Sequence, residues 1–90
     1  MNYEVIVKKK VLKSIRQLST WGQKKTALLL ADLRDKGPEQ MNWQNYKKIG
    51  RTKYRCDLRP SLSVCWRYRK KNGSRIEVDY VGNSEKAPYE

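Results

Sequence analysis

Four stretches of the chain alternate between apolar and polar residues, a pattern with a period of two that is typical of half-buried β-strands. They cover residues 3–8, 53–59, 62–69 and 75–81. The third stretch shows the pattern best, because its even positions are Leu62, Val64, Trp66 and Tyr68 and its odd positions are Ser63, Cys65, Arg67 and Arg69. One face of that strand is therefore apolar and the other is basic.

The pattern changes to a helical spacing after the first strand. Apolar residues at 11, 12, 15 and 18 predict one helix. Ser19 or Thr20 can cap a second helix that begins near Trp21, and Lys36-Gly37-Pro38 ends it. This helix carries Ala27, Leu28, Leu30, Ala31 and Leu33, and its leucines are expected to join the core.

The connecting segments complete the topology. Residues 39–46 read as a loop, Asn72-Gly73 as a two-residue hairpin turn, and 83–90 as an extended tail. The prediction is one α+β domain over residues 1–90 with the order β-α-α-β-β-β. Two N-terminal helices pack on one face of a small, mainly antiparallel twisted sheet. The other face is open and basic, and Tyr80 belongs to the inward set of the last strand.

Composition narrows the possible partners. The 90 residues carry a net charge of +12 and 38% hydrophobic residues, enough for one small core. Such a charge suits nucleic acid, an acidic protein or an anionic membrane. No apolar run approaches the roughly 20 residues of a membrane span, and the first residues do not resemble a signal peptide. We expect a cytoplasmic protein that does not engage membranes.

The two cysteines argue against a disulfide and a metal site. If 56 faces 64 and 65 faces 55 across a hairpin, Cys56 and Cys65 point to opposite faces of the sheet. A chain with two cysteines and no histidine also offers a poor ligand set for zinc. We expect no metal and no small-molecule cofactor.

Positive charge gathers in the second half of the chain. Asp57 is the only acid from residue 47 to 75. The eleven basic residues of this stretch are Lys47, Lys48, Arg51, Lys53, Arg55, Arg59, Arg67, Arg69, Lys70, Lys71 and Arg75. Alternation places five of the arginines together on the outer face of three strands: Arg55, Arg59, Arg67, Arg69 and Arg75. A solvated face is one interpretation; a polyanion site is favoured, because guanidinium forks suit phosphate and stack on bases.

The order of several short motifs resembles the RelE/ParE superfamily of bacterial toxins. These motifs are Lys-Lys-Ile-Gly, Tyr-Arg-Cys-Asp-Leu, Cys-Trp-Arg, Asp-Tyr-Val-Gly and a closing Glu-Lys-Ala-Pro-Tyr. The resemblance implies a RelE-like toxin that cuts messenger RNA in the ribosome and leaves 2′,3′-cyclic phosphate ends. It also implies a cognate antitoxin as partner.

The implied catalytic residues match only in part. Arg55, Arg59 and the tail tyrosine, Tyr89, fit the family pattern. Asp57 and Ser63 replace expected basic residues, and Ser84 or its neighbour Asn83 replaces another. The residues expected to bind the nucleic acid are Lys47, Lys48, Lys53, Arg67, Arg69 and Arg75.

Three hypotheses remain open on these residues. The first is a ribosome-dependent mRNA endoribonuclease with altered catalytic positions. The second is a non-catalytic member that binds RNA, the ribosome or an antitoxin. The third is a ParE-like inhibitor of DNA gyrase.

Overall fold

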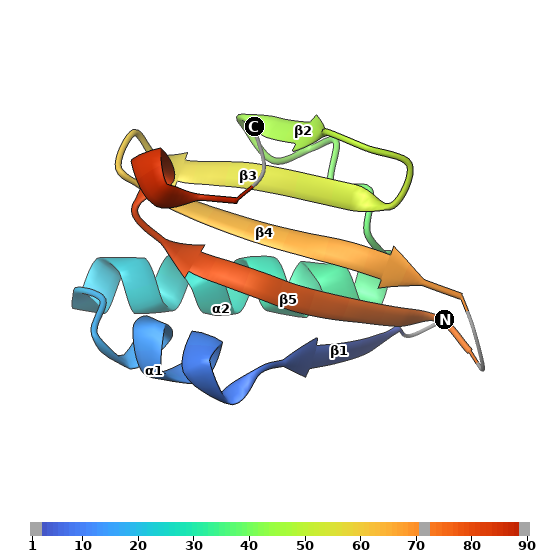
Figure 1. Cartoon of the computed structure of the whole chain (residues 1–90), viewed down its shortest axis with the longest axis horizontal. Coiled ribbons are helices and arrows are strands. Elements are labelled where there is room, and N and C mark those ends of the chain that lie inside the picture. Colours follow the sequence, from blue (N-terminus) through green and yellow to red (C-terminus); the bar gives the residue numbers. More distant parts are fainter. Residues whose placement is uncertain (1–2, 71–72, 89–90) are drawn as a thin grey trace.

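A computed structural model of the chain describes residues 3–70 and 73–88. They form one five-stranded sheet with two helices (Figure 1). In chain order the elements are β1 (Glu4–Val7), α1 (Lys9–Arg16), α2 (Thr20–Lys36), β2 (Tyr46–Lys48), β3 (Lys53–Arg59), β4 (Leu62–Arg69), β5 (Arg75–Gly82) and the short 3-10 helix η1 (Ser84–Lys86). The α+β prediction is confirmed.

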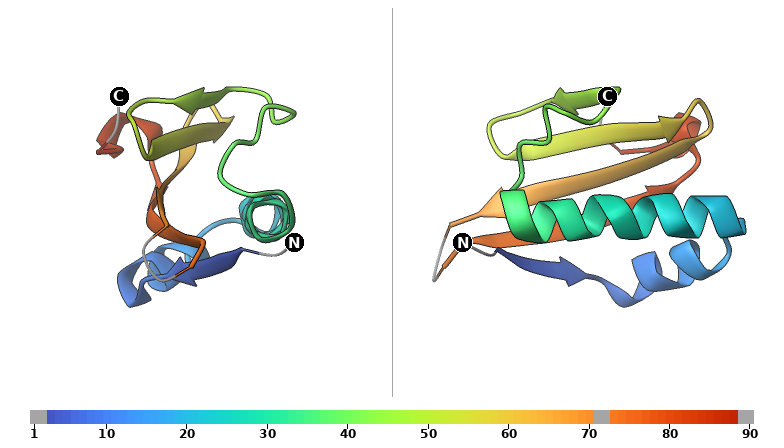
Figure 2. Two further views of the ribbon diagram at one scale, coloured as in Figure 1. Left: turned by 90° about the vertical axis from the view of Figure 1, so that its right-hand side faces the viewer. Right: turned by 180° about the vertical axis from the view of Figure 1, so that it is seen from behind.

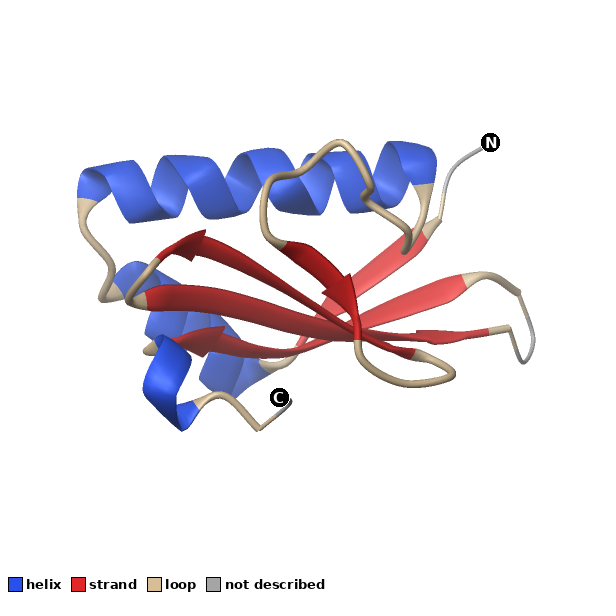
Figure 3. Cartoon of the chain, turned by 90° about the horizontal axis from the view of Figure 1, so that it is seen from above, coloured by secondary structure: helices blue, strands red, loops and turns tan. Residues whose placement is uncertain are grey.

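The sheet has the strand order β1-β5-β4-β3-β2. β1 pairs with β5 in parallel, and the other neighbours are antiparallel. The long helix α2 lies behind the sheet and runs along it, whereas α1 lies near β5 (Figure 2). Figure 3 shows the twisted strands beneath α2, with η1 on the side of the sheet away from that helix.

Local sequence explains where the helices begin and end. α1 already begins at Lys9, so two of the lysines expected to close the first strand belong to its first turn. The Ser19 side chain caps α2 by accepting a 3.1 Å hydrogen bond from the Gly22 backbone N–H. Gly37, with φ of 98°, ends the helix, and its N–H donates to the Leu33 carbonyl.

The core lies between α2 and the apolar face of the sheet. α2 contributes a buried stripe made of Gly22, Thr26, Leu29 and Leu33. Trp66 is fully buried, stacks on Tyr54 at 5.9 Å, and donates its indole N–H to the Pro38 carbonyl at 3.1 Å. Leu28 was expected in the core, but it is 57% exposed because it lies one position to the side of the buried stripe.

β2 is a strand that the pattern of alternation missed. It takes Tyr46 from the predicted loop and pairs Lys47 with Arg55. The preceding turn is fixed by Gln40, whose buried amide donates to the carbonyls of Asp32 and Gly37. Three residues are too few to show a period, so β2 depends on this anchored turn and on its partner strand.

Two register shifts change which side chains face outward. Cys56 pairs with Val64 and Arg55 with Cys65, as predicted, and both cysteines are buried and free. Continued without a shift, the predicted pairing of 56 with 64 would put Leu58 opposite Leu62. A shift between Asp57 and Arg59 puts Arg59 there instead.

The second shift, between Cys65 and Trp66, puts Tyr80 opposite Cys65. Tyr80 therefore belongs to the outer face, and Val81 takes the buried position in its place. A β-bulge adds one residue to one strand and so reverses the alternation beyond it.

The end of the described chain is not extended throughout. Ser84–Lys86 form η1, which Asn83 caps by accepting a hydrogen bond from the Glu85 N–H. Tyr89, Lys71 and Asn72 lie outside the described residues, so the predicted Asn72-Gly73 turn is described only at Gly73, where φ is 116°. Within residues 3–70 and 73–88, no helix has the length and apolar character that crossing a membrane requires.

Candidate nucleic-acid interface

Four polar residues form one hydrogen-bonded cluster on the outer face of the sheet. Arg55 donates from Nε to Asp57 at 2.8 Å and from a terminal nitrogen to the Ser63 hydroxyl at 3.3 Å and the Ser84 carbonyl at 3.2 Å. The Ser63 hydroxyl also contacts the Asp57 carboxylate and, at 2.6 Å, the Ser84 hydroxyl. We call these four residues the Arg55 cluster.

The backbone register explains why these residues meet. Asp57 pairs with Ser63, and Ser63 pairs with Gly82, two residues before Ser84. Ser63 has a single hydroxyl proton, which it donates to the Asp57 carboxylate, so the Ser84 hydroxyl donates to Ser63. The positions that depart from the family pattern are therefore not scattered, because Asp57, Ser63 and Ser84 satisfy one another.

The Asp57 carboxyl is held in its charged form. Burial raises its pKa, but hydrogen bonds from Ser63 and Arg55, together with the charges of Arg55 and Lys47, outweigh burial and lower the pKa below its usual 3.8. Asp57 is therefore ionised at neutral pH and offsets the charge of Arg55. Only 14% of the Arg55 side chain is exposed, so little of this arginine is accessible to a ligand.

Acidic side chains pair with three more of the arginines predicted on the outer face. Arg67 binds Asp79 at 2.9 Å, and Arg69 binds Glu77 at 3.1 Å. Arg75 binds Glu4 at 3.3 Å. Glu77 and Asp79 lie on β5, and Glu4 lies on β1. All three fall outside residues 47–75, but the sheet brings them next to arginines of that stretch.

Arg59, which was predicted to be catalytic, and Lys48, which was predicted to bind nucleic acid, lie elsewhere. The register shift carries Arg59 to the side of α2, where its guanidinium carbon lies 3.8 Å from the centre of the Trp21 ring. Lys48 pairs with Tyr54, which faces the core, and its ammonium group lies 5.7 Å from that ring and 3.7 Å from Glu39. Neither residue joins the Arg55 cluster.

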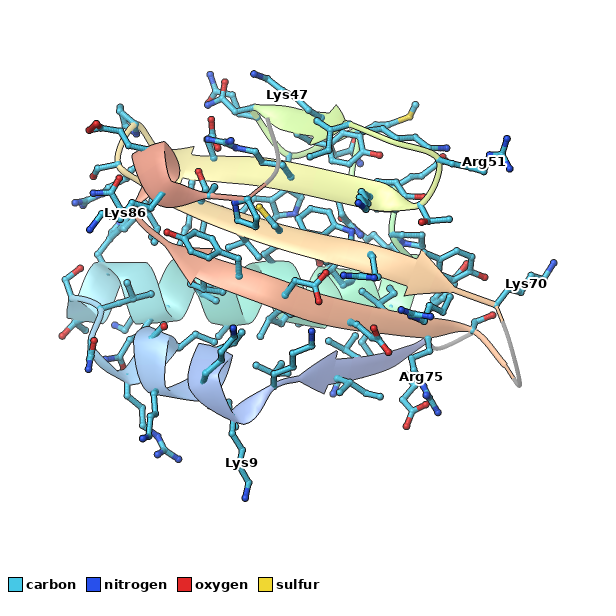
Figure 4. All side chains as sticks on the ribbon, in the orientation of Figure 1. Lys9, Lys47, Arg51, Lys70, Arg75 and Lys86 are labelled. Carbon is cyan, nitrogen blue, oxygen red and sulfur yellow. The ribbon has the colours of Figure 1, made fainter. Side chains whose placement is uncertain are left out.

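Exposed lysines lie on the elements that carry the cluster or on their neighbours. Lys47 lies beside Arg55 in the register, and Lys53 lies beside Arg67. Lys86 is exposed on η1, and Figure 4 shows Lys47 at the top of the view and Lys86 at the left-hand end of the sheet. Lys86 was not predicted, because the expected extended tail gave it no defined place.

Tyr80 adds a phenol to the outer face next to the cluster. It lies opposite Cys65, and its hydroxyl donates to the Asn83 carbonyl at 2.7 Å. Burial raises the Tyr80 pKa above 10, and the nearby Cys65 raises it further, against the opposing effect of Arg55. A neutral phenol donates a hydrogen bond at neutral pH but does not take up a proton, so Tyr80 is not suited to act as a base.

Comparison with solved structures identifies the fold. The chain superimposes on a double arginine-to-alanine variant of E. coli toxin RelE in the free state, with a TM-score of 0.74 and 18% identity over 97% of this chain and 88% of that one. It superimposes on isolated E. coli RelE with a TM-score of 0.72 and 16% identity over 96% and 88% of the two chains.

A third match is the same RelE variant in complex with a peptide of antitoxin RelB. Its TM-score is 0.68, at 15% identity over 93% of this chain and 85% of that one. No protein-family model and no curated protein matches the sequence. The chain therefore has the RelE toxin fold over nearly its whole length.

Proposed function

We propose that this protein is the toxin of a toxin–antitoxin pair and that it cleaves messenger RNA bound to the ribosome. The observation that carries the proposal is the position of the Arg55 cluster within a RelE fold. Four of the positions at which the resemblance implies catalytic groups, Arg55, Asp57, Ser63 and Ser84, lie together on the open face of the sheet. The exposed lysines nearby add the positive charge that a phosphodiester requires.

The proposed reaction needs a base, a proton for the leaving oxygen and positive charge beside the phosphate. The RNA 2′-hydroxyl attacks the adjacent phosphorus and gives its proton to the base, while the 5′-oxygen departs and takes up a proton from solvent, giving a 2′,3′-cyclic phosphate and a 5′-hydroxyl. Tyr89, in its phenolate form, is the proposed base. Arg55, with Lys47 and Lys53 beside it, would stabilise the charge that develops on the phosphorane oxygens.

A second candidate function has its own support. Arg55 already donates to a carboxylate, a hydroxyl and a carbonyl, so much of its capacity to bind phosphate is in use. An arginine engaged in this way fits a protein that binds RNA or the ribosome without cutting. The two candidates share the same surface and differ in whether Tyr89 performs chemistry.

A primer-extension assay on messenger RNA in translating ribosomes separates them. Wild-type protein is compared with Tyr89→Phe and with the control Tyr46→Phe, which removes a phenol hydroxyl from the opposite side of the sheet. Cleavage by wild type and by Tyr46→Phe, together with a loss of about 100-fold or more in Tyr89→Phe, supports the nuclease. No cleavage by folded wild type leaves the non-catalytic binder, and equal cleavage by all three rejects Tyr89 as the base.

The proposed partner is an antitoxin with an acidic segment. The net charge of +12 favours such a partner, and an interface built on charge weakens as salt is added. Affinity of the purified pair that does not change between low and high salt would contradict an electrostatic interface.

A further inference from the structure

Helix α2 exposes an apolar flank that the core does not use. Its buried stripe is Gly22, Thr26, Leu29 and Leu33. One position before each of these lies a second stripe, consisting of Trp21, Lys25, Leu28 and Asp32. Its two apolar members remain largely accessible, since Trp21 is 38% exposed and Leu28 is 57% exposed.

Two cavities follow one another along this flank. The larger, of 410 Å³, lies between Lys25, Leu28 and Asp32 of α2 and the residues Asn42–Asn45, Asp57 and Leu58. The smaller, of 290 Å³, lies between the start of α2 and Arg59, with Trp21, Ser61 and Leu62 in its wall. We call the pair of cavities the α2–β3 groove.

Arg59 lies in this groove against Trp21. Its guanidinium carbon lies 3.8 Å from the centre of the Trp21 ring, a cation–π contact that restricts the side chain. A carboxylate is the natural partner of a guanidinium. Arg59 and Trp21 together therefore offer a charged contact next to an apolar one.

Two cations line the groove, Lys25 from α2 and Arg59 from β3. The two acids that line the larger cavity are already engaged: Asp32 accepts the Trp43 indole N–H at 2.8 Å, and Asp57 binds Arg55. The groove thus combines apolar side chains with cations that attract an acidic partner.

We propose that the α2–β3 groove binds an amphipathic, acidic segment of a protein partner. Trp21 and Leu28 are seven residues apart, so they lie about 10.5 Å apart along α2. This separation matches two turns of a bound helix, whose apolar residues would enter the two cavities while its carboxylates meet Arg59 and Lys25. The proposal deepens the antitoxin partnership of the proposed function by naming a surface, but its test does not depend on RNA cleavage.

The opposite flank of α2 lacks this combination. A cavity there lies between Val5 and Val7 of β1 and the α2 residues Ala27, Leu30, Ala31 and Arg34. Its one cation, Arg34, lies 3.6 Å from Asp35. Nothing at that site selects an acidic partner, so the inference concerns the α2–β3 groove.

The test measures the binding of two fluorescein-labelled peptides to purified protein by anisotropy. The first is EELLEELLEELLEE, an acidic amphipathic helix former, and the second replaces its leucines by serines without changing the charge. We expect the leucine peptide to bind at least tenfold more tightly, because its apolar side chains fill the cavities. Equal binding of the two peptides would overturn the proposal, because it would show that only the negative charge of the peptides attracts them to the protein.

Variants locate the binding surface. Trp21→Ala and Arg59→Gln should each weaken the leucine peptide by more than about fivefold. The controls Met41→Ala and Arg51→Gln change an exposed methionine and an exposed arginine that line neither cavity, and they should stay within about twofold. Circular dichroism verifies that each variant is folded. Because Arg59→Gln alters an exposed side chain, this variant still tests the binding surface if Trp21→Ala is unstable.

Two results would reject the groove. Wild-type affinity in both Trp21→Ala and Arg59→Gln would place the peptide elsewhere on the protein. Displacement of the peptide by single-stranded RNA, with RNA affinity also lost in Trp21→Ala, would show that the groove serves RNA and not an acidic segment. Failure of the ribosome assay affects neither measurement, so the two proposals fail separately.

Discussion

Neutralising Asp57 should strengthen the binding of RNA while weakening the fold. In Asp57→Asn the side chain still accepts a hydrogen bond but loses the charge that offsets Arg55. An RNA phosphate about 6 Å from the lost carboxylate would escape about 0.7 kcal/mol of repulsion in water, which makes binding roughly threefold tighter. If Arg55 gains one phosphate contact, the log–log dependence of affinity on salt becomes steeper by about 0.7.

The assay is fluorescence anisotropy with a labelled single-stranded RNA at several salt concentrations. Five phosphate contacts would give a slope of about −3.5, but Arg55, Arg67, Arg69 and Arg75 are paired with acids, so we expect a shallower wild-type slope. Asp35→Asn is the matched control, because it removes the same charge from an exposed acid of α2. An Asp57→Asn slope no steeper than that of Asp35→Asn would refute the argument that Asp57 withholds Arg55 from RNA.

Three further predictions concern stability and reactivity. Ser63→Ala should lower the free energy of unfolding by about 1–2 kcal/mol in urea titrations, because buried Ser63 contacts Asp57 and Ser84; no loss would contradict a stabilising cluster. The pKa of Asp57 is lower in the folded protein than its value of about 3.8 in the unfolded chain, so the charged carboxylate stabilises the fold above that pH. The stability advantage of wild type over Asp57→Asn should therefore disappear as the pH falls through the pKa of the folded protein. Burial raises the Cys56 pKa to about 11, so iodoacetamide at pH 8 should label Cys56 rapidly only in urea, as mass spectrometry of the labelled peptide would show.

Periodicity was sufficient for most of the fold because most of its elements are long enough to show a period. Helix α2 has 17 residues with a cap and a terminal glycine, and β4 has eight residues with a clear apolar face. β2 has three residues and depends on contacts made by Gln40 and on pairing with β3. Contacts between residues distant in sequence stabilise β2, so the local sequence carries no pattern that predicts this strand.

The candidate site was harder to predict because it depends on neighbours in the sheet. A count from residue 47 to 75 finds Asp57 alone, but the sheet places Glu77 and Asp79 beside Arg69 and Arg67. The register shift that moved Arg59 is equally invisible in the alternation of residue types. The sequence also marks Ser63 only as a departure from a pattern, whereas its hydrogen bonds explain how the protein accommodates that departure.

The parallel pairing of β1 with β5 affects how this protein can fold during synthesis. Glu4 and Arg75, which are 71 residues apart, pair across the two strands, so β1 has no partner until β5 has left the ribosomal tunnel. Contacts this distant in sequence slow folding and leave early segments uncovered while they wait. Val5 and Val7, which pack against the core, cannot complete their packing through most of translation. The nascent chain therefore offers an interval in which a chaperone or a binding partner can reach surfaces that the finished sheet conceals.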